Sequence, residues 1–257
     1  MKRRNFMKAA GLLAVAPAIT SVAATQENLT AEKQIYEYRV YTLTGSNTEM
    51  LDEYLNKCMI PAYNRMNIFA GVFKNYKPED DQIRSVLLIY PDIITYYKTK
   101  TALWSDLAFR KAAQPFFDAT AKKPAFTKID TYLAEAFDNF PRIKRPSSIR
   151  TLFEMRIYQS PNEEANKRKV EMFNEGEIAV FDKTGINSVC YGDILAGPGM
   201  AALFYMTWYE NETLRTAAWK AFSDHPDWKA MAGNKEYANT ATNNKSTLLT
   251  PMDYSQL

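Results

Sequence analysis

One short pattern occurs twice in this chain. The pattern of residues 36–41, YEYRVY, returns at residues 153–158 as FEMRIY, 117 positions later (36 to 153). In both copies Glu, Arg and Tyr occupy alternate positions, with apolar residues between them. Because side chains alternate between the two faces of a β-strand, each copy predicts a strand with one Glu-Arg-Tyr face and one apolar face. The pattern therefore indicates an internal duplication.

The rest of the chain repeats the same order of elements in each half. In the first half, apolar periodicity and turn residues predict strands at about 35–43, 68–76, 83–90 and 126–136. They predict helices at 50–66, 93–100 and 104–120, the first with a kink or break at Pro61. The second half predicts strands at 152–159, 186–194, 201–209 and 246–251, and helices ending near 183, 222 and 231. Each half reads β-α-β-β-α-β, which is the ferredoxin-like order.

The duplication predicts how the two halves pack. A single ferredoxin-like half leaves one face of its sheet uncovered, and two halves in one chain can cover both by pressing sheet to sheet. We therefore predict an α+β fold in which two tandem ferredoxin-like repeats form a pseudo-dimeric α+β barrel, with helices outside and the Glu-Arg-Tyr faces turned inward. The expected boundaries are 25–137 for the first repeat, 138–150 for a linker and 151–257 for the second repeat.

The first 24 residues predict a twin-arginine signal peptide. Arg3 and Arg4 precede a short apolar run at 9–19, and small residues at 21–24 offer a cleavage site. The run is too short for a permanent membrane span. The expected location is therefore outside a bacterial inner membrane, in the periplasm or cell envelope. Without the four N-terminal bases, 28 of the 32 Lys and Arg residues face 29 acids, so no basic patch argues for nucleic acid.

Several further motifs accompany the duplicated strand. They are SPNE at 160–163, MFNEGE at 172–177, LAGP at 195–198, AWKAF at 218–222 and PDWK at 226–229. Together with both E-x-R-x-Y strands, they resemble the NIPSNAP family over nearly the whole chain after the signal. The resemblance implies a dimeric α+β barrel, but no settled reaction and no list of catalytic residues. Because better-known eukaryotic members carry a mitochondrial signal instead, their proposed roles in vesicles or mitophagy are not carried over.

The two polar strand faces supply the candidate ligand site. The predicted ligand-binding residues are Glu37, Arg39, Tyr41, Glu154, Arg156 and Tyr158. Each Glu/Arg pair can hold an anionic or polar ligand, and the tyrosines add hydroxyl donors. The alternative is that each pair is a self-satisfied ion pair that pins the sheets together, since a buried charge needs a partner.

Other reactive residues are few. His225, the only histidine, lies between Ser-Asp and Pro in a helix-start context, so we expect it in a connection at the rim and not in catalysis. Cys58 and Cys190 are predicted to be buried free thiols, with a disulfide as the alternative in an exported chain. One histidine and two separated cysteines lack metal-ligand spacing, so no metal site is predicted.

Three functions remain compatible with these residues. The leading hypothesis is an exported barrel that binds a small, partly apolar ligand in its interior. The alternatives are a cofactor-independent monooxygenase-like oxidoreductase, and a structural or partner-binding protein with a filled barrel. No hydrolase, kinase or dehydrogenase motif is present, no particular cofactor is indicated, and a homodimer stays open. Five aromatic residues either line a pocket or belong to the core: Trp208, Trp219, Trp228, Tyr205 and Tyr209.

Overall fold

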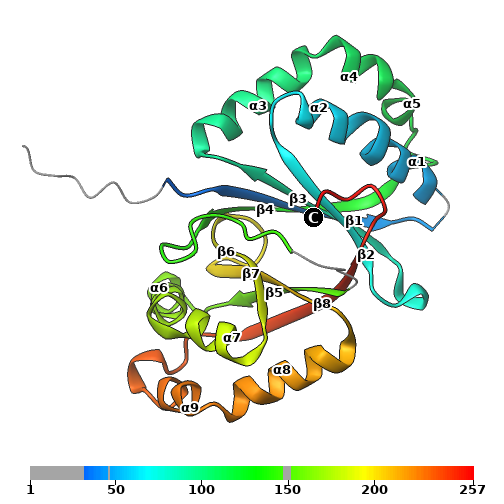
Figure 1. Ribbon diagram of the computed structural model, residues 1–257. Helices are drawn as coiled ribbons and strands as arrows, with labels where there is room; N and C mark the ends of the chain where they lie inside the picture. Colours follow the sequence, from blue (N-terminus) through cyan, green and yellow to red (C-terminus); the bar gives the residue numbers. More distant parts are fainter. Residues whose placement is uncertain (1–31, 46, 147–151) are drawn as a thin grey trace, which may run out of the picture.

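Eight antiparallel strands close into a barrel with helices on its outside (Figure 1). The computed structural model describes residues 32–45, 47–146 and 152–257, so the predicted signal peptide lies outside the described residues. The strands are β1 (Ile35–Leu43), β2 (Phe69–Asn75), β3 (Ile83–Tyr90), β4 (Phe126–Ala136), β5 (Leu152–Gln159), β6 (Asn187–Ala196), β7 (Ala202–Tyr209) and β8 (Asn243–Pro251).

Each half supplies one four-stranded sheet and its own layer of helices. The first-half helices are α1 (Thr48–Glu53), η1 (Tyr54–Met59), α2 (Ile60–Asn64), η2 (Pro78–Asp80), α3 (Ile93–Ser105), α4 (Leu107–Ala112) and α5 (Gln114–Phe117). The second-half helices are α6 (Glu163–Met172), η3 (Phe173–Glu177), α7 (Ile178–Thr184), α8 (Glu212–Asp224), α9 (Pro226–Ala232) and η4 (Lys235–Tyr237). The two main layers lie on opposite sides of the barrel in Figure 1.

The strand order confirms the predicted fold. The barrel runs β1-β3-β2-β8-β5-β7-β6-β4, so each half has the ferredoxin-like order, β4-β1-β3-β2 or β6-β7-β5-β8. The halves meet where β2 pairs with β8 and where β4 pairs with β6. Closure leaves no free sheet edge in the barrel.

The first long helix does not break at Pro61. Instead, α1 passes into η1, a π-helical segment, and α2 follows with Pro61 in its first turn. Pro61 directly follows the π-helical segment, where the Ile60 N–H donates to the Leu55 carbonyl five residues back and the i−4 ladder is already interrupted, so its missing N–H is tolerated. The second half has a π-helical segment at the matching place, η3, between α6 and α7.

Strand pairing defines equivalent positions in the two halves. Tyr38 on β1 and Met155 on β5 are equivalent, because β1 and β5 are offset by 117 positions. Tyr38 pairs with Leu87 on β3 and Met155 pairs with Met206 on β7, so β3 and β7 are offset by 119 positions (87 to 206). The same offset of 119 relates α3 to α8, because their N-cap residues are Asp92 and Asn211. These offsets allow the two halves to be compared residue by residue.

The prediction that the Glu-Arg-Tyr faces turn into the barrel is wrong. The space between the sheets is filled by the opposite strand faces, a buried apolar cluster that includes Tyr36, Tyr38, Phe153, Met155, Phe204 and Met206. Tyr41 belongs to the cluster under the first helix layer, and Tyr158 to the one under the second. The pattern cannot distinguish the two faces, because each strand is covered on both. A sheet-to-sheet interface built from two duplicated apolar faces offers no partners for charges, whereas the helices bring them.

The two cysteines lie in different clusters and are free thiols, as predicted. Cys58 packs under the first helix layer, and Cys190 lies between the sheets, where burial raises the pKa of its thiol to about 12. Within the described ranges, none of the helices has the length and apolar character needed to cross a membrane.

Candidate functional site

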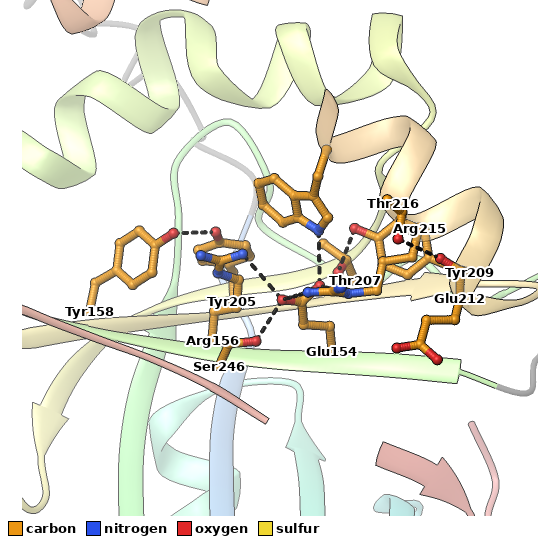
Figure 2. A network of polar contacts seen from close by, with 11 residues as sticks. Glu154, Arg156, Tyr158, Tyr205, Thr207, Tyr209, Glu212, Arg215, Thr216 and Ser246 are labelled. Atoms are coloured by element: carbon orange, nitrogen blue, oxygen red, sulfur yellow. Dashed lines mark hydrogen bonds and ion pairs between the residues drawn. The ribbon is translucent and has the colours of Figure 1, made fainter. Parts of the chain in front are cut away.

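Glu154 on β5 is the centre of a buried polar network (Figure 2). Its Oε1 accepts hydrogen bonds from Ser246 Oγ at 2.6 Å, Arg215 Nη2 at 2.8 Å and Arg156 Nη1 at 3.1 Å. Its Oε2 accepts from Arg215 Nε at 2.7 Å and Trp219 Nε1 at 2.9 Å. Burial alone would raise the pKa of this carboxyl, but the hydrogen bonds and positive charges around it hold the pKa below its ordinary value of 4.5.

Helix α8 brings two of these donors to the strand. Asn211 caps the helix by accepting a hydrogen bond from the Leu214 N–H, which fixes where its first turn begins. Arg215 and Trp219 then lie one turn apart, at i and i+4, on the face toward the sheet. Sequence reasoning assigned no role to Arg215 or Ser246. The spacing of Arg215 and Trp219 was visible, but their target could not be identified without knowing which strand face meets the helix.

The first half contains the equivalent carboxylate, Glu37. It accepts hydrogen bonds from Arg39 Nε at 2.9 Å, Tyr90 Oη at 2.8 Å and Lys100 Nζ at 2.7 Å. Lys100 on α3 occupies the position of Trp219 on α8, 119 residues apart. Burial raises the pKa of Glu37, but the charges of Arg39 and Lys100 outweigh it and lower the pKa overall. Both Glu/Arg pairs are therefore ion pairs inside their own half.

The two arginines differ in how completely they are satisfied. Arg39 Nη2 donates to the hydroxyl of Tyr63 at 3.0 Å. The second-half residue equivalent to Tyr63 is Phe181. Each carbonyl accepts a hydrogen bond from the N–H of the isoleucine five residues later, Ile68 or Ile186. Phe181 has no hydroxyl to accept from Arg156. Arg39 Nε donates to Glu37 Oε1 at 2.9 Å, whereas the buried Nε of Arg156 has no hydrogen-bond partner among the residues that the structure describes.

A pocket of about 530 Å³ opens beside Arg156. It lies between the outer face of β5 and β8 and helices α6, η3, α8 and α9. Its lining residues are Arg156, Tyr158, Lys169, Met172, Glu177, Trp219, Phe222, Ser223, Trp228, Ala232, Tyr237, Asn239, Thr240, Ala241 and Asn244. This volume is within the range of small-molecule sites, which are typically apolar with a few convergent polar groups.

The aromatic groups of the pocket hold its cations in place. The guanidinium carbon of Arg156 lies 4.4 Å from the centroid of the Trp219 ring, which is a cation–π contact. Tyr158 shares a hydrogen bond of 2.8 Å with Tyr205 behind the pocket wall. Trp228 contacts Phe222 at the side of α9, with ring centroids 4.4 Å apart. Aromatic rings and a stacked guanidinium together form a wall suited to a flat ligand.

A second buried ion pair lies in the pocket wall. Lys169 Nζ donates to Glu177 Oε2 at 2.7 Å, and both side chains are almost fully buried. Burial raises the pKa of the Glu177 carboxyl, although the charge and hydrogen bond of Lys169 act in the opposite direction. The sequence motif at 172–177 contains Glu177, but sequence reasoning did not single out this residue, because Lys169 meets it only through the π-helical turn of η3.

The six predicted ligand residues therefore form two separate groups of three, and only Arg156 and Tyr158 line the pocket. Of the aromatic candidates, Trp219 and Trp228 line it as well, whereas Trp208 and Tyr209 pack in core clusters. His225 is the N-cap of α9, where its Nδ1 accepts a hydrogen bond from the Asp227 N–H at 3.2 Å. Its expected place in a connection is confirmed.

A metal site is not formed by the part of the chain that the structure describes. No group of three or more His, Cys, Asp and Glu side chains converges there. The charged groups of the pocket wall are two cations and one carboxylate, Arg156, Lys169 and Glu177. With Glu177 ionised the wall carries one net positive charge, which favours an anionic ligand over a metal cation.

Comparison with known proteins finds one family match, in the second half of the chain. Residues 153–256 match the NIPSNAP family model, so the resemblance is shown for the second half of the chain and stays a prediction for the first. No curated protein matches the chain.

Solved structures share the fold over most of the chain. An anthrone oxidase-like protein is 14% identical, with a TM-score of 0.57, and the match covers 87% of this chain and 94% of that one. A candidate monooxygenase from Fusobacterium nucleatum is 12% identical, with a TM-score of 0.55 and coverage of 88% and 99%. One from Lactobacillus acidophilus is 10% identical, with a TM-score of 0.54 and coverage of 86% and 94%. At these identities the likeness concerns the fold alone.

Proposed function

We propose that this chain binds a small, planar aromatic anion in the pocket of its second half. The observation that carries the proposal is the pocket beside Arg156, where the arginine keeps a buried Nε–H that nothing in the described chain accepts. A buried donor without an acceptor costs about 1–3 kcal/mol. The Arg156 side chain is 20% exposed, so a ligand carboxylate in the pocket can pair with the accessible part of its guanidinium through a charge-assisted hydrogen bond.

The pocket walls account for the other two properties of the ligand. Trp219, Trp228 and Phe222 offer ring faces for a flat apolar body. Lys169 adds a second cation at the wall, and its partner Glu177 has a raised pKa, so the local charge favours an anion. The first half lacks the same opportunity at Arg39, because its Nε already donates to Glu37 Oε1 and its Nη2 to Tyr63. The site therefore belongs to the second half and not to the barrel interior that the sequence suggested.

Calorimetric titration with 2-naphthoate tests the proposal. The parent protein should bind this probe, and Arg156→Met should weaken binding by about 10–100-fold, as expected for loss of a hydrogen bond to a charged group. Arg39→Met is the matched control, because it removes the equivalent arginine of the first half and should leave the affinity unchanged. Equal loss in both variants, or no binding by a folded parent, would reject the proposed site.

A cofactor-independent oxidoreductase is the second candidate. The observation in its favour is Glu177, a carboxyl with a raised pKa at the wall of an aromatic pocket, which can take a proton from a phenolic substrate. The monooxygenase names attached to proteins of this fold agree with it but do not establish it. Oxygen uptake with a phenolic substrate, abolished by Glu177→Gln, would favour this candidate over simple binding.

The filled barrel interior also keeps a structural or partner-binding role in view. If the parent neither binds 2-naphthoate nor takes up oxygen with a phenolic substrate, that role is favoured.

Export to the periplasm or cell envelope belongs to the same proposal and rests on the N-terminal sequence. Fractionation of cells that produce the full chain should place it outside the inner membrane, and Arg3→Lys/Arg4→Lys should retain it in the cytoplasm. Retention of both proteins in the cytoplasm would contradict export.

A further inference from the structure

The outer face of α3 and the start of α4 carry an exposed apolar strip. Its members are Ile93 (43% exposed), Ile94 (61%), Tyr97 (75%), Trp104 (60%) and Leu107 (75%). The opposite side of α3 is the one that packs on the protein, since Thr99 and Leu103 are buried there. Figure 1 shows α3 and α4 at the outside of the first helix layer, far from the second half. Contiguous exposed apolar surface of this kind marks an interaction site.

The duplicated half provides an internal control for this surface. At the equivalent positions, 119 residues later, α8 and α9 carry Glu212, Thr213, Thr216, Ser223 and Pro226. Both helix pairs are capped by side chains at equivalent positions, with Asp106 and His225 capping the second helix of each pair. The fold therefore does not require the apolar strip. It is a property of the first half alone.

The charge of the two helix pairs differs in the same way. Residues 93–113 contain four bases and one acid, a net charge of +3, whereas residues 212–232 contain three of each. The one acid, Asp106, already pairs with Arg65. Lys98, Arg110 and Lys111 are exposed beside the apolar strip. The acids next to the strip are the two N-cap residues, Asp92 and Asp106, and the three exposed bases outnumber them. Apolar and aromatic side chains flanked by an excess of bases are typical of a helix that lies on an anionic membrane surface.

We propose that the α3–α4 face binds peripherally to a bilayer surface that contains anionic phospholipid. Tyr97 and Trp104 would lie at the level of the headgroups, where such aromatic side chains are enriched. Lys98 and Lys111 would contact the phosphates. A second copy of the chain is a poorer occupant, because a two-fold contact through this face would bring the same bases of both copies together. The proposal depends neither on the pocket nor on the route of export.

Co-sedimentation with vesicles tests this surface on the full chain. The parent should bind vesicles of phosphatidylcholine mixed with phosphatidylglycerol, and bind pure phosphatidylcholine more weakly. The variant Ile94→Thr/Tyr97→Thr/Trp104→Ser installs the residues of α8, and its binding should fall by at least about tenfold. The variant Lys98→Ala/Lys111→Ala, which also copies the second half, should lose the preference for phosphatidylglycerol and its salt dependence.

Two further measurements keep the result interpretable. Trp104 contacts Phe117, so Ile94→Thr/Tyr97→Thr serves as a variant that leaves this aromatic packing intact. All of the proteins share the same N-terminal segment, so a difference between them reports on α3 and α4. No binding by the parent, or equal binding by the parent and this double variant, would overturn the proposal. Self-association of the parent that the double variant abolishes, without vesicle binding, would assign the face to a second copy instead.

Discussion

The Glu154 network makes a quantitative prediction for Glu154→Gln. An amide can accept through its oxygen but must place an NH2 group where the other carboxylate oxygen was. That NH2 would face either the three donors of Oε1 or the two donors of Oε2. The better orientation still loses the bonds from Arg215 Nε and Trp219 Nε1, and it leaves both arginines without their anion.

The expected loss of stability follows from these contacts. Removing one partner of a buried ion pair costs about 3–5 kcal/mol, so Glu154→Gln should lower the free energy of unfolding by that amount at pH 7. Urea unfolding followed by circular dichroism measures it, with an unchanged m-value expected. Glu79→Gln, in the exposed turn between β2 and β3, is the control and should change stability by less than about 0.5 kcal/mol.

The pH dependence of the same pair of proteins supplies an independent check. Because the folded-state pKa of Glu154 lies below its ordinary 4.5, its ionisation stabilises the fold above pH 4.5, and this contribution is lost as the pH falls through the lowered pKa. The difference between parent and Glu154→Gln should therefore shrink in acid. A loss of less than about 1 kcal/mol at pH 7, or a difference that grows in acid, would refute this account of the network.

Three other predictions concern different parts of the fold. Lys169→Met should lower the free energy of unfolding by about 3–5 kcal/mol at pH 7. Because the folded-state pKa of Glu177 is raised, ionisation of Glu177 costs folding free energy as the pH rises through that pKa. The difference in unfolding free energy between parent and Lys169→Met, measured with urea, should therefore shrink toward pH 4.5. Phe204→Ala, between the sheets, should lower the free energy of unfolding by about 3–5 kcal/mol in the same assay. A loss below about 1 kcal/mol would argue against a filled interior. Gly192→Ala would place a Cβ 2.8 Å from Ala134 Cβ at the β4–β6 seam, so thermal unfolding should show a lower Tm, and an unchanged Tm would contradict the tight packing.

The sequence determined the fold well because its two strongest signals were local and repeated. β1, β3, β4 and β5 begin and end where periodicity placed them, and the duplicated strand pattern predicted two ferredoxin-like sheets. The last strand, β8, starts at Asn243 instead of 246, because its first residues are polar and exposed and carry no apolar alternation. Their pairing with β5 extends the strand, and pairing across the chain is not visible in local pattern.

The site was predicted only in part, for a different physical reason. The alternation of Glu154, Arg156 and Tyr158 showed that they share a face, but both faces of β5 are covered in this barrel. Which face meets the helices depends on residues far away in the sequence, such as Arg215 and Trp219, which lie 61 and 65 positions from Glu154. The same applies to Lys169 and Glu177, which become neighbours through the π-helical turn. Burial and pairing are tertiary properties, and strand periodicity alone does not specify them.

A crystal structure with bound 2-naphthoate tests the central claim most directly, because it locates the ligand relative to both faces of the sheet. The account predicts the aromatic ring between β5 and helices α8 and α9, with its carboxylate within hydrogen-bonding distance of Arg156. Density for the ligand between the two sheets, against Tyr38 and Phe204, or beside Arg39 under the first helix layer, would contradict it.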